Sequence, residues 1–277
     1  MNAPESVAKD DRILDLATPK ILARSAGGIG WITFNQPEKR NAISMQMWAG
    51  VQQAAEAFAK DEAVRVVVLS GAGGKAFASG ADISEFETAR NSAEAEEKFH
   101  AFADNARAAL RAMGKPILAM IQGYCIGGGC ATALLADIRI ATPESKFGVP
   151  AAKLGVAYAL EGLQRLVALV GPSVAKEIMF TGRQFTAAEA LAAGLINRIV
   201  EPAALEETVT ALARTIASNA PLSIYHSREA IDMLAGDPSR WDKARIEGLY
   251  SRCFDSADYR EGRTAFMEKR VPQFKGR

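Results

Sequence analysis

The sequence has few of the side chains from which disulfide scaffolds and metal centres are built. Only 3 cysteines and 2 histidines occur among its 277 residues. Cys125, Cys130 and Cys253 are odd in number and lack the paired spacing of zinc ligands, so we expect neither a disulfide framework nor a metal site. Such sparse cysteine is typical of a reducing compartment, and we expect a cytoplasmic protein.

An excess of charge of either sign is also absent. The 33 basic and 32 acidic residues nearly cancel, which gives no electrostatic reason to expect a nucleic acid or a membrane surface as partner. No uncharged apolar run approaches the roughly 20 residues that span a bilayer. Residues 1–15 contain no apolar stretch suited to a signal sequence, so we expect a soluble protein that begins with a frayed segment.

What the sequence does contain is an alternation of apolar strands and amphipathic helices, the pattern of an α/β fold. Ser44 is placed to cap the first helix, and Thr186 with Glu189 predicts a capping box. The expected strands are 21–26, 28–34, 64–70, 116–121 and 138–141. The expected helices are 45–61, 93–113, 128–136, 161–170, 173–180, 187–193, 203–217, 221–234 and 241–254.

This order predicts three regions. Residues 1–19 are expected to be a flexible N-terminus, and 20–200 a core of repeated ββα units that holds the ligand site. Residues 201–277 are expected to form a helical C-terminal region, with the boundary near Glu201 and Pro202. The ββα units share no obvious sequence repeat.

Two glycine turns match nucleotide-binding loops only in part. The segment 71–75 ends in Gly-Lys, but Ala76 follows where a phosphate-binding loop has Ser or Thr, and the four-residue spacer is missing. The segment 127–129 has Thr132 where a dinucleotide-binding turn has its third glycine. The sequence therefore indicates neither kind of nucleotide site.

These turns are suited to bring backbone N–H groups close to a ligand, because glycine has no β-carbon in the way. Gly128 is expected at the start of a helix, and Ala81 lies in the loop 77–82. Two such N–H groups aimed at one oxygen form an oxyanion hole, in which each donor contributes about 3 kcal/mol to lowering the barrier. The alternative is that both segments are only tight turns in a packed sheet.

Ordered motifs along the chain resemble the crotonase superfamily, the enoyl-CoA hydratase/isomerase family. They are Asn35–Pro37 with Arg40–Ala42, then Phe77–Asp82, Gly123–Gly129 and Ala136–Ala141. The resemblance covers the chain from about residue 20 to its end. It implies a crotonase-like spiral of ββα units, a C-terminal helical trimerisation region, and a homotrimer or dimer of trimers. It also implies that coenzyme A is part of the substrate and that no other cofactor is tightly bound.

By this resemblance, the N–H groups of Ala81 and Gly128 hold the thioester oxygen. A lysine is a suitable point charge for the phosphates of coenzyme A, although an ordinary solvated lysine is the alternative. Phe266 and Lys269 match residues that often come from a neighbouring subunit. The positions that match the family's coenzyme A site are Lys39, Ala42, Ala78, Asp82, Ile83, Phe266 and Lys269.

The hydratases of this family use two glutamates to activate water and return a proton, and this sequence has neither. Ala131 and Ala151 stand at the matching positions. Losing one acid/base group costs about 10²- to 10⁴-fold in rate, so an efficient standard hydratase is not expected. Enolate stabilisation remains, which serves lyase, isomerase, decarboxylase or thioester-hydrolysis chemistry. The alternative is a catalytically silent acyl-CoA-binding homologue.

Two side chains are candidates to replace the glutamates. Tyr158 resembles a tyrosine of methylmalonyl-CoA decarboxylase, although that enzyme has histidine where Ala81 stands and glutamate where Ala131 stands. Glu161 lies where the next helix begins, in a segment that borders the acyl pocket in related proteins. The alternatives are a packed tyrosine with a satisfied hydroxyl, and a carboxylate that only favours the helix dipole.

Overall fold

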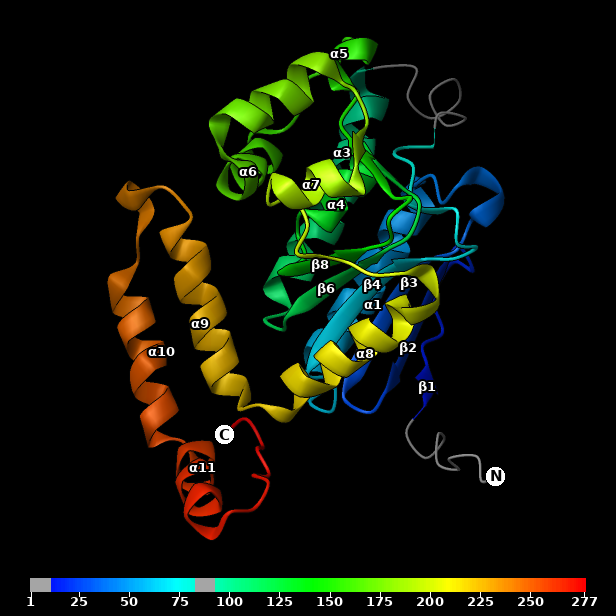
Figure 1. Ribbon diagram of the computed structural model, residues 1–277. Helices are drawn as coiled ribbons and strands as arrows, with labels where there is room; N and C mark the ends of the chain where they lie inside the picture. The colour runs from blue at the N-terminus through cyan, green and yellow to red at the C-terminus, as the bar shows by residue number, and fades with distance from the viewer. Residues whose placement is uncertain (1–10, 83–92) are drawn as a thin grey trace.

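The computed structural model describes residues 11–82 and 93–277, and it consists of an α/β core with a helical arm (Figure 1). The strands are β1 (Arg12–Ile13), β2 (Ile21–Ala26), β3 (Ile29–Phe34), β4 (Val66–Gly71), β5 (Ala76–Ala78), β6 (Ile117–Ile121), β7 (Tyr124–Ile126), β8 (Ile138–Ala141), β9 (Lys146–Gly148), β10 (Phe185–Thr186) and β11 (Arg198–Ile199). The helices are α1 (Met45–Lys60), α3 (Ala93–Ala112), α4 (Gly128–Ala133), α5 (Ala151–Leu154), α6 (Leu160–Thr181), α7 (Ala187–Ala192), α8 (Pro202–Ser218), α9 (Pro221–Leu234), α10 (Lys243–Asp255) and α11 (Ala257–Glu268).

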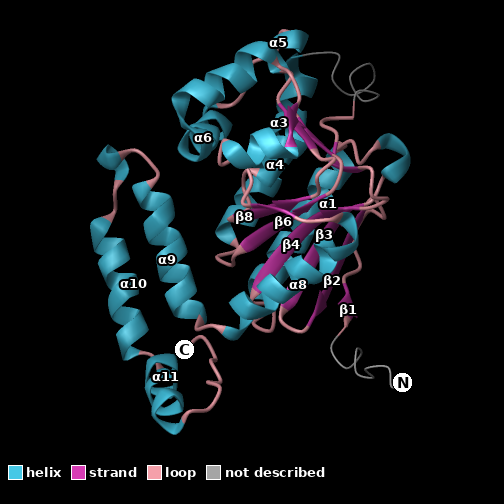
Figure 2. Cartoon of the chain, in the orientation of Figure 1, coloured by secondary structure: helices cyan, strands magenta, loops and turns pink. Residues whose placement is uncertain are grey.

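The strands form two sheets, and the chain alternates between them. The larger sheet has the order β1-β2-β3-β4-β6-β8-β11, and the smaller has the order β10-β9-β7-β5. In β4-β5-α3, β6-β7-α4 and β8-β9-α5, the first strand joins the large sheet, the second joins the small sheet, and a helix follows (Figure 2). This repetition confirms the predicted α/β fold of ββα units.

Both faces of the large sheet are buried. Val67 and Leu69 of β4 belong to the core shared with α1 and α3, whereas Val66 and Val68 belong to the core under α8. Adjacent side chains of a strand point to opposite faces, so a continuous apolar run is what a doubly covered strand requires. No helix in the described part of the chain is both long and apolar enough to cross a membrane.

The ends of several elements differ from the sequence predictions. β1 pairs antiparallel with β2, and the Leu14 N–H donates to the Ala23 carbonyl at 2.9 Å, so the paired core begins before residue 20. The two helices predicted at 161–170 and 173–180 meet in α6 at Gly171, whose backbone is not helical. The three-residue strands β5, β7 and β9, as well as α11, were not predicted.

Asn41 holds the turn before α1 against the start of β5, the strand that precedes Ala81. Its side chain is fully buried, and Nδ2 donates to the carbonyls of Ala72 at 3.0 Å and Ala76 at 2.8 Å. Its Oδ1 accepts from the Gln36 N–H at 2.9 Å. Asparagine tolerates the left-handed backbone found here, with φ 55°, better than most residues.

We expect Asn41→Ala to lower the free energy of unfolding by about 2 to 4 kcal/mol, because it leaves buried backbone groups unpaired and strains the left-handed backbone. Asn41→Gly removes only the hydrogen bonds and should lie between alanine and wild type. The control is Asn35→Ala, which deletes one exposed bond to the Pro19 carbonyl. Urea denaturation measures all three, and an equal loss in Asn41→Ala and Asn35→Ala contradicts the prediction.

Candidate functional site

The N–H groups of Ala81 and Gly128, here called the amide pair, lie beside each other. β5 and β7 run parallel, so the loops that follow them leave the small sheet on the same side. A methyl group placed on Gly128 would lie 3.8 Å from the Ala81 nitrogen. Among the residues that the structure describes, no acceptor takes either N–H group. The pair is therefore available to one oxygen atom from outside the chain.

Backbone bonds fix Ala81 from the side of α1. The Ile43 N–H donates to the Gly80 carbonyl at 2.7 Å, and the Asp82 N–H donates to the Ile43 carbonyl at 3.0 Å. These two bonds form a parallel bridge between Ile43 and Ala81. Because the bridge uses the groups on either side of Ala81, its own N–H points away and stays unpaired.

Glycine is required where α4 approaches β5. Gly127 has φ 54° and ψ −119°, a conformation closed to other residues, and its N–H donates to the Gly148 carbonyl at 2.8 Å. A β-carbon on Gly129 would lie 2.2 Å from the Ala78 carbonyl oxygen. The spacing of these glycines thus lets the first turn of α4 pack directly on the strand end that carries Ala81.

Ala131 and Ala151 both lie near the amide pair. The Ala131 N–H donates to the Gly127 carbonyl at 2.9 Å, which places it one turn along α4. Pro150, next to Ala151, comes within 4.0 Å of a methyl group placed on Gly127. Neither alanine side chain exchanges a proton, so neither can activate a water molecule for attack.

The structure brings Tyr158 toward the amide pair. Its hydroxyl is buried without a hydrogen-bond partner among the described residues, which excludes the packed tyrosine with a satisfied hydroxyl. Burial raises its pKa well above the usual range, and the nearby Cys130, two residues after Gly128, acts in the same direction. Tyr158 therefore stays a neutral phenol at ordinary pH and is suited to donate a hydrogen bond.

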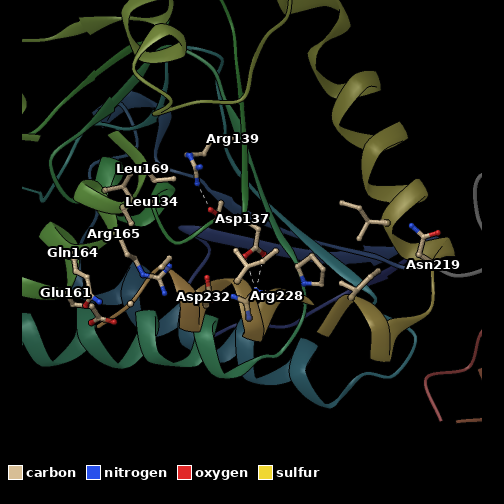
Figure 3. A pocket seen from close by; sticks show the side chains of 18 residues that line it. Leu134, Asp137, Arg139, Glu161, Gln164, Arg165, Leu169, Asn219, Arg228 and Asp232 are labelled. Atoms are coloured by element: carbon tan, nitrogen blue, oxygen red, sulfur yellow. Dashed lines mark hydrogen bonds and ion pairs between the residues drawn. The ribbon is translucent and has the colours of Figure 1, made fainter. Parts of the chain in front are cut away.

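Glu161 lies elsewhere. Its carboxylate pairs with Arg111 of α3 at 2.6 Å and lines a cavity of about 600 Å³ between α6 and α9 (Figure 3). That cavity also includes Leu134 and Asp137, which follow the C-terminal end of α4, whereas Gly128 begins that helix. The structure therefore does not bring Glu161 to the amide pair.

Charged side chains in this cavity connect α9 to the α/β core. Arg228 of α9 donates from Nε to the Asp137 carboxylate at 3.0 Å, and both side chains are visible in Figure 3. The same carboxylate accepts from the Ile117 N–H of β6 at 2.7 Å. Because Asp137 binds both partners at once, it fixes the position of α9 against the start of β6.

Part of the predicted coenzyme A site comes together beside Ala81. Lys39 Nζ lies 2.9 Å from the carboxylate of Asp82, whose side chain is only 6% exposed. Ala42 and Ala78 are buried in the same two segments. Ile83 lies outside the described residues. The Lys39–Asp82 pair braces the loop while leaving Lys39 partly open to solvent.

Phe266 and Lys269 lie far from the amide pair within one chain. Both are at the end of α11, in the arm formed by α9, α10 and α11, which extends away from the sheets (Figure 1). Phe266 is 83% exposed, and Lys269 caps the helix in a left-handed conformation. A single chain therefore does not assemble the complete set of predicted coenzyme A residues.

Two of the cysteines and one histidine have surroundings that the structure describes. Cys125 and Cys130 are buried and free, and burial raises the pKa of the Cys125 thiol. The ring of His226 packs against Tyr250. Among the side chains that the structure describes, no group of three or more His, Cys, Asp or Glu is arranged to hold a metal ion.

Comparisons with known proteins cover nearly the whole chain. The family described as Enoyl-CoA hydratase/isomerase matches residues 24–277. The short-chain-enoyl-CoA hydratase of Clostridium acetobutylicum is 35% identical over 93% of this chain and 98% of its own length. The crotonyl-CoA hydratase of Syntrophomonas wolfei is 34% identical over 94% of this chain and 99% of its own length.

A solved structure extends the similarity to three dimensions. The enoyl-CoA hydratase/carnithine racemase from Magnetospirillum magneticum superimposes with a TM-score of 0.89 at 38% sequence identity, covering 95% of this chain and 97% of that one. The family match, the identity of the relatives and the shared architecture agree with one another. The chain belongs to the enoyl-CoA hydratase/isomerase family of the crotonase superfamily.

Proposed function

We propose that this protein is an enzyme that stabilises the enolate of a coenzyme A thioester between the N–H groups of Ala81 and Gly128. The observation that carries the proposal is the amide pair itself, two unpaired backbone donors side by side. Fixed donors aimed at developing charge are often the largest single contribution to catalysis. Two relatives are named as hydratases of enoyl-CoA and crotonyl-CoA, and these names support a thioester as the substrate.

The reaction proposed is of the lyase, isomerase or decarboxylase type rather than standard hydration. Hydration requires groups that activate water and return a proton, and Ala131 and Ala151 supply neither. Tyr158 is the side chain proposed to orient the acyl group or to donate a proton. Coenzyme A enters as part of the substrate, and no other cofactor takes part.

Hydration is the first test. We expect the protein to hydrate crotonyl-CoA at least about 10²-fold more slowly than a relative that has both glutamates, because no side chain activates the water. The assay follows loss of the enoyl absorbance, with the two enzymes at equal concentration. Equal rates would contradict the proposed departure from hydratase chemistry.

A catalytically silent acyl-CoA-binding protein is the second candidate, favoured by the same two alanines. A panel of enoyl, malonyl-type and β-keto thioesters separates the candidates. Mass spectrometry detects any product, and calorimetry detects binding. Binding without any product supports the silent protein, whereas a product from one thioester class supports the enzyme and names its reaction.

Gly128→Pro removes one donor of the amide pair without deleting a side chain. Gly128 is the first residue of α4, a position that tolerates proline. We expect kcat to fall about 10²- to 10³-fold while the affinity for coenzyme A is kept. The control is Lys243→Pro, at the exposed first position of α10, which should retain activity. Retained turnover in Gly128→Pro refutes the role of the pair.

We further propose a homotrimer or a dimer of trimers, in which α11 completes the site of a neighbouring chain. The arm extends from the core, and Phe266, Met267 and Val271 on it are each at least 80% exposed. Apolar surface of this extent usually marks an association site.

Light scattering should therefore give three or six times the 29.6 kDa of one chain. We expect Phe266→Asp to shift this mass toward the single chain, because a charge at a buried contact opposes association. Ile13→Asp is the matched control, since Ile13 is equally exposed, at 83%, but lies on the sheet edge of the core. A monomeric wild-type protein would contradict the proposal.

A further inference from the structure

Three buried hydrogen-bond donors near the amide pair have no acceptor in the described part of the chain. They are Nε1 of Trp48, Nε of Arg107 and the hydroxyl of Tyr158. Nearly all buried polar groups in folded proteins are paired, so each exception needs an explanation. An indole N–H and a guanidinium only donate, and a phenol can donate. Three unpaired donors therefore suit a ligand that supplies acceptors.

The three side chains come from three separate elements and lie near one another. The guanidinium carbon of Arg107 on α3 lies 5.1 Å from the ring centroid of Trp48 on α1. Arg111, one turn further along α3, pairs with Glu161, which is three residues after Tyr158. The charge of Arg107 also reaches Tyr158, where it opposes the rise that burial causes in the pKa of the phenol. α3 thus faces both Trp48 and Tyr158.

The elements that carry Trp48 and Tyr158 adjoin the segments of the amide pair. Trp48 lies in the first turn of α1, where its N–H donates to the Ser44 carbonyl at 3.1 Å, and Ser44 follows Ile43, the bridge partner of Ala81. On the other side, Tyr158 lies close enough to Cys130 to be influenced by it, in the first turn of α4 after Gly128. A ligand held by the amide pair would therefore lie next to the elements that carry these donors.

Among the described side chains, the charge of Arg107 is only partly balanced. One guanidinium nitrogen donates to Asp104 at 3.1 Å, but the Asp104 side chain is 65% exposed and shared with solvent. Nε faces the interior without an acceptor. Ala131 and Ala151 contribute no carboxylate nearby. The missing group is thus an acceptor with negative charge, and a carboxylate matches a guanidinium and a phenol best.

We propose that the acyl group of the substrate carries its own carboxylate, which Arg107 and Tyr158 bind while the amide pair holds the thioester oxygen. The substrate class is then the coenzyme A thioesters of dicarboxylic acids. This inference rests on the proposed function and specifies its substrate. Trp48 forms the platform under the guanidinium and offers the third donor.

The test compares thioesters of equal chain length with and without the second carboxylate, on the full-length protein. The pairs are malonyl- and propionyl-CoA, succinyl- and butyryl-CoA, and glutaryl- and valeryl-CoA. We expect the dicarboxylic member of at least one pair to bind about 10- to 100-fold more tightly, measured as Kd by calorimetry. Where a thioester is turned over, kcat/KM replaces Kd in the comparison.

The residue assignment is tested by Arg107→Gln, which should remove the preference and leave binding of the monocarboxylic thioester unchanged. Tyr158→Phe should reduce the preference while keeping the ring. Arg107→Lys keeps the positive charge but loses the planar guanidinium, so it should retain part of the preference. This variant replaces Arg107→Gln in the test if Arg107→Gln does not fold. Arg24→Gln is the matched control, because Arg24 lies 5.0 Å from the Trp31 ring, on the opposite face of the large sheet.

Arg24→Gln should keep the full preference. The inference is overturned if the wild-type protein shows no preference at any of the three lengths, or if Arg107→Gln retains it. The proposed function fails in a different way, when neither member of any pair binds or is converted. Binding of both members with equal affinity therefore removes the carboxylate proposal and leaves the thioester proposal standing.

Discussion

The site depends on one constraint, the direct contact between the first turn of α4 and the end of β5. Gly129 permits this contact, since any β-carbon there would collide with the Ala78 carbonyl. The bridge from Ile43 then fixes the Ala81 backbone from the other side. Under the proposed function, neither donor would need to move as charge develops on the thioester oxygen, and donors that are fixed beforehand stabilise a transition state most effectively. The buried hydrogen bonds from Asn41 to the Ala72 and Ala76 carbonyls hold the other end of β5 in place.

Much of the fold was predictable because its main strands carry their own signal. Val66–Leu69 is apolar without interruption, as a strand buried on both faces must be. The strands β5, β7 and β9 have three residues each and are defined by partners elsewhere in the chain, so no local periodicity marks them. β1 was missed for the same reason, and the polar surface of α11 hid its helical pattern.

The backbone of the candidate site carries local sequence signals, whereas most of its side-chain contacts do not. The glycines near Gly128 are local signals, and in the structure Gly128 lies beside Ala81. Glu161 was a reasonable candidate from its position, but its carboxylate pairs with Arg111 of α3, a residue far from it in the sequence. Arg107 and Trp48 meet only because α3 packs on α1. Residue spacing within one helix cannot predict a contact between side chains of two helices.

The two alanines and the unpaired donors have a common electrostatic consequence. A glutamate at position 131 or 151 would add negative charge beside a second carboxylate on the acyl group, and like charges at such distances disfavour each other. With alanine at both positions, Arg107 and Tyr158 are the polar side chains identified on that side of the amide pair. Under the proposed function, the two alanines would both slow hydration and leave an anionic acyl group without this repulsion. Under the two proposals, positions 131 and 151 would thus influence both the rate of hydration and the binding of a dicarboxylic thioester.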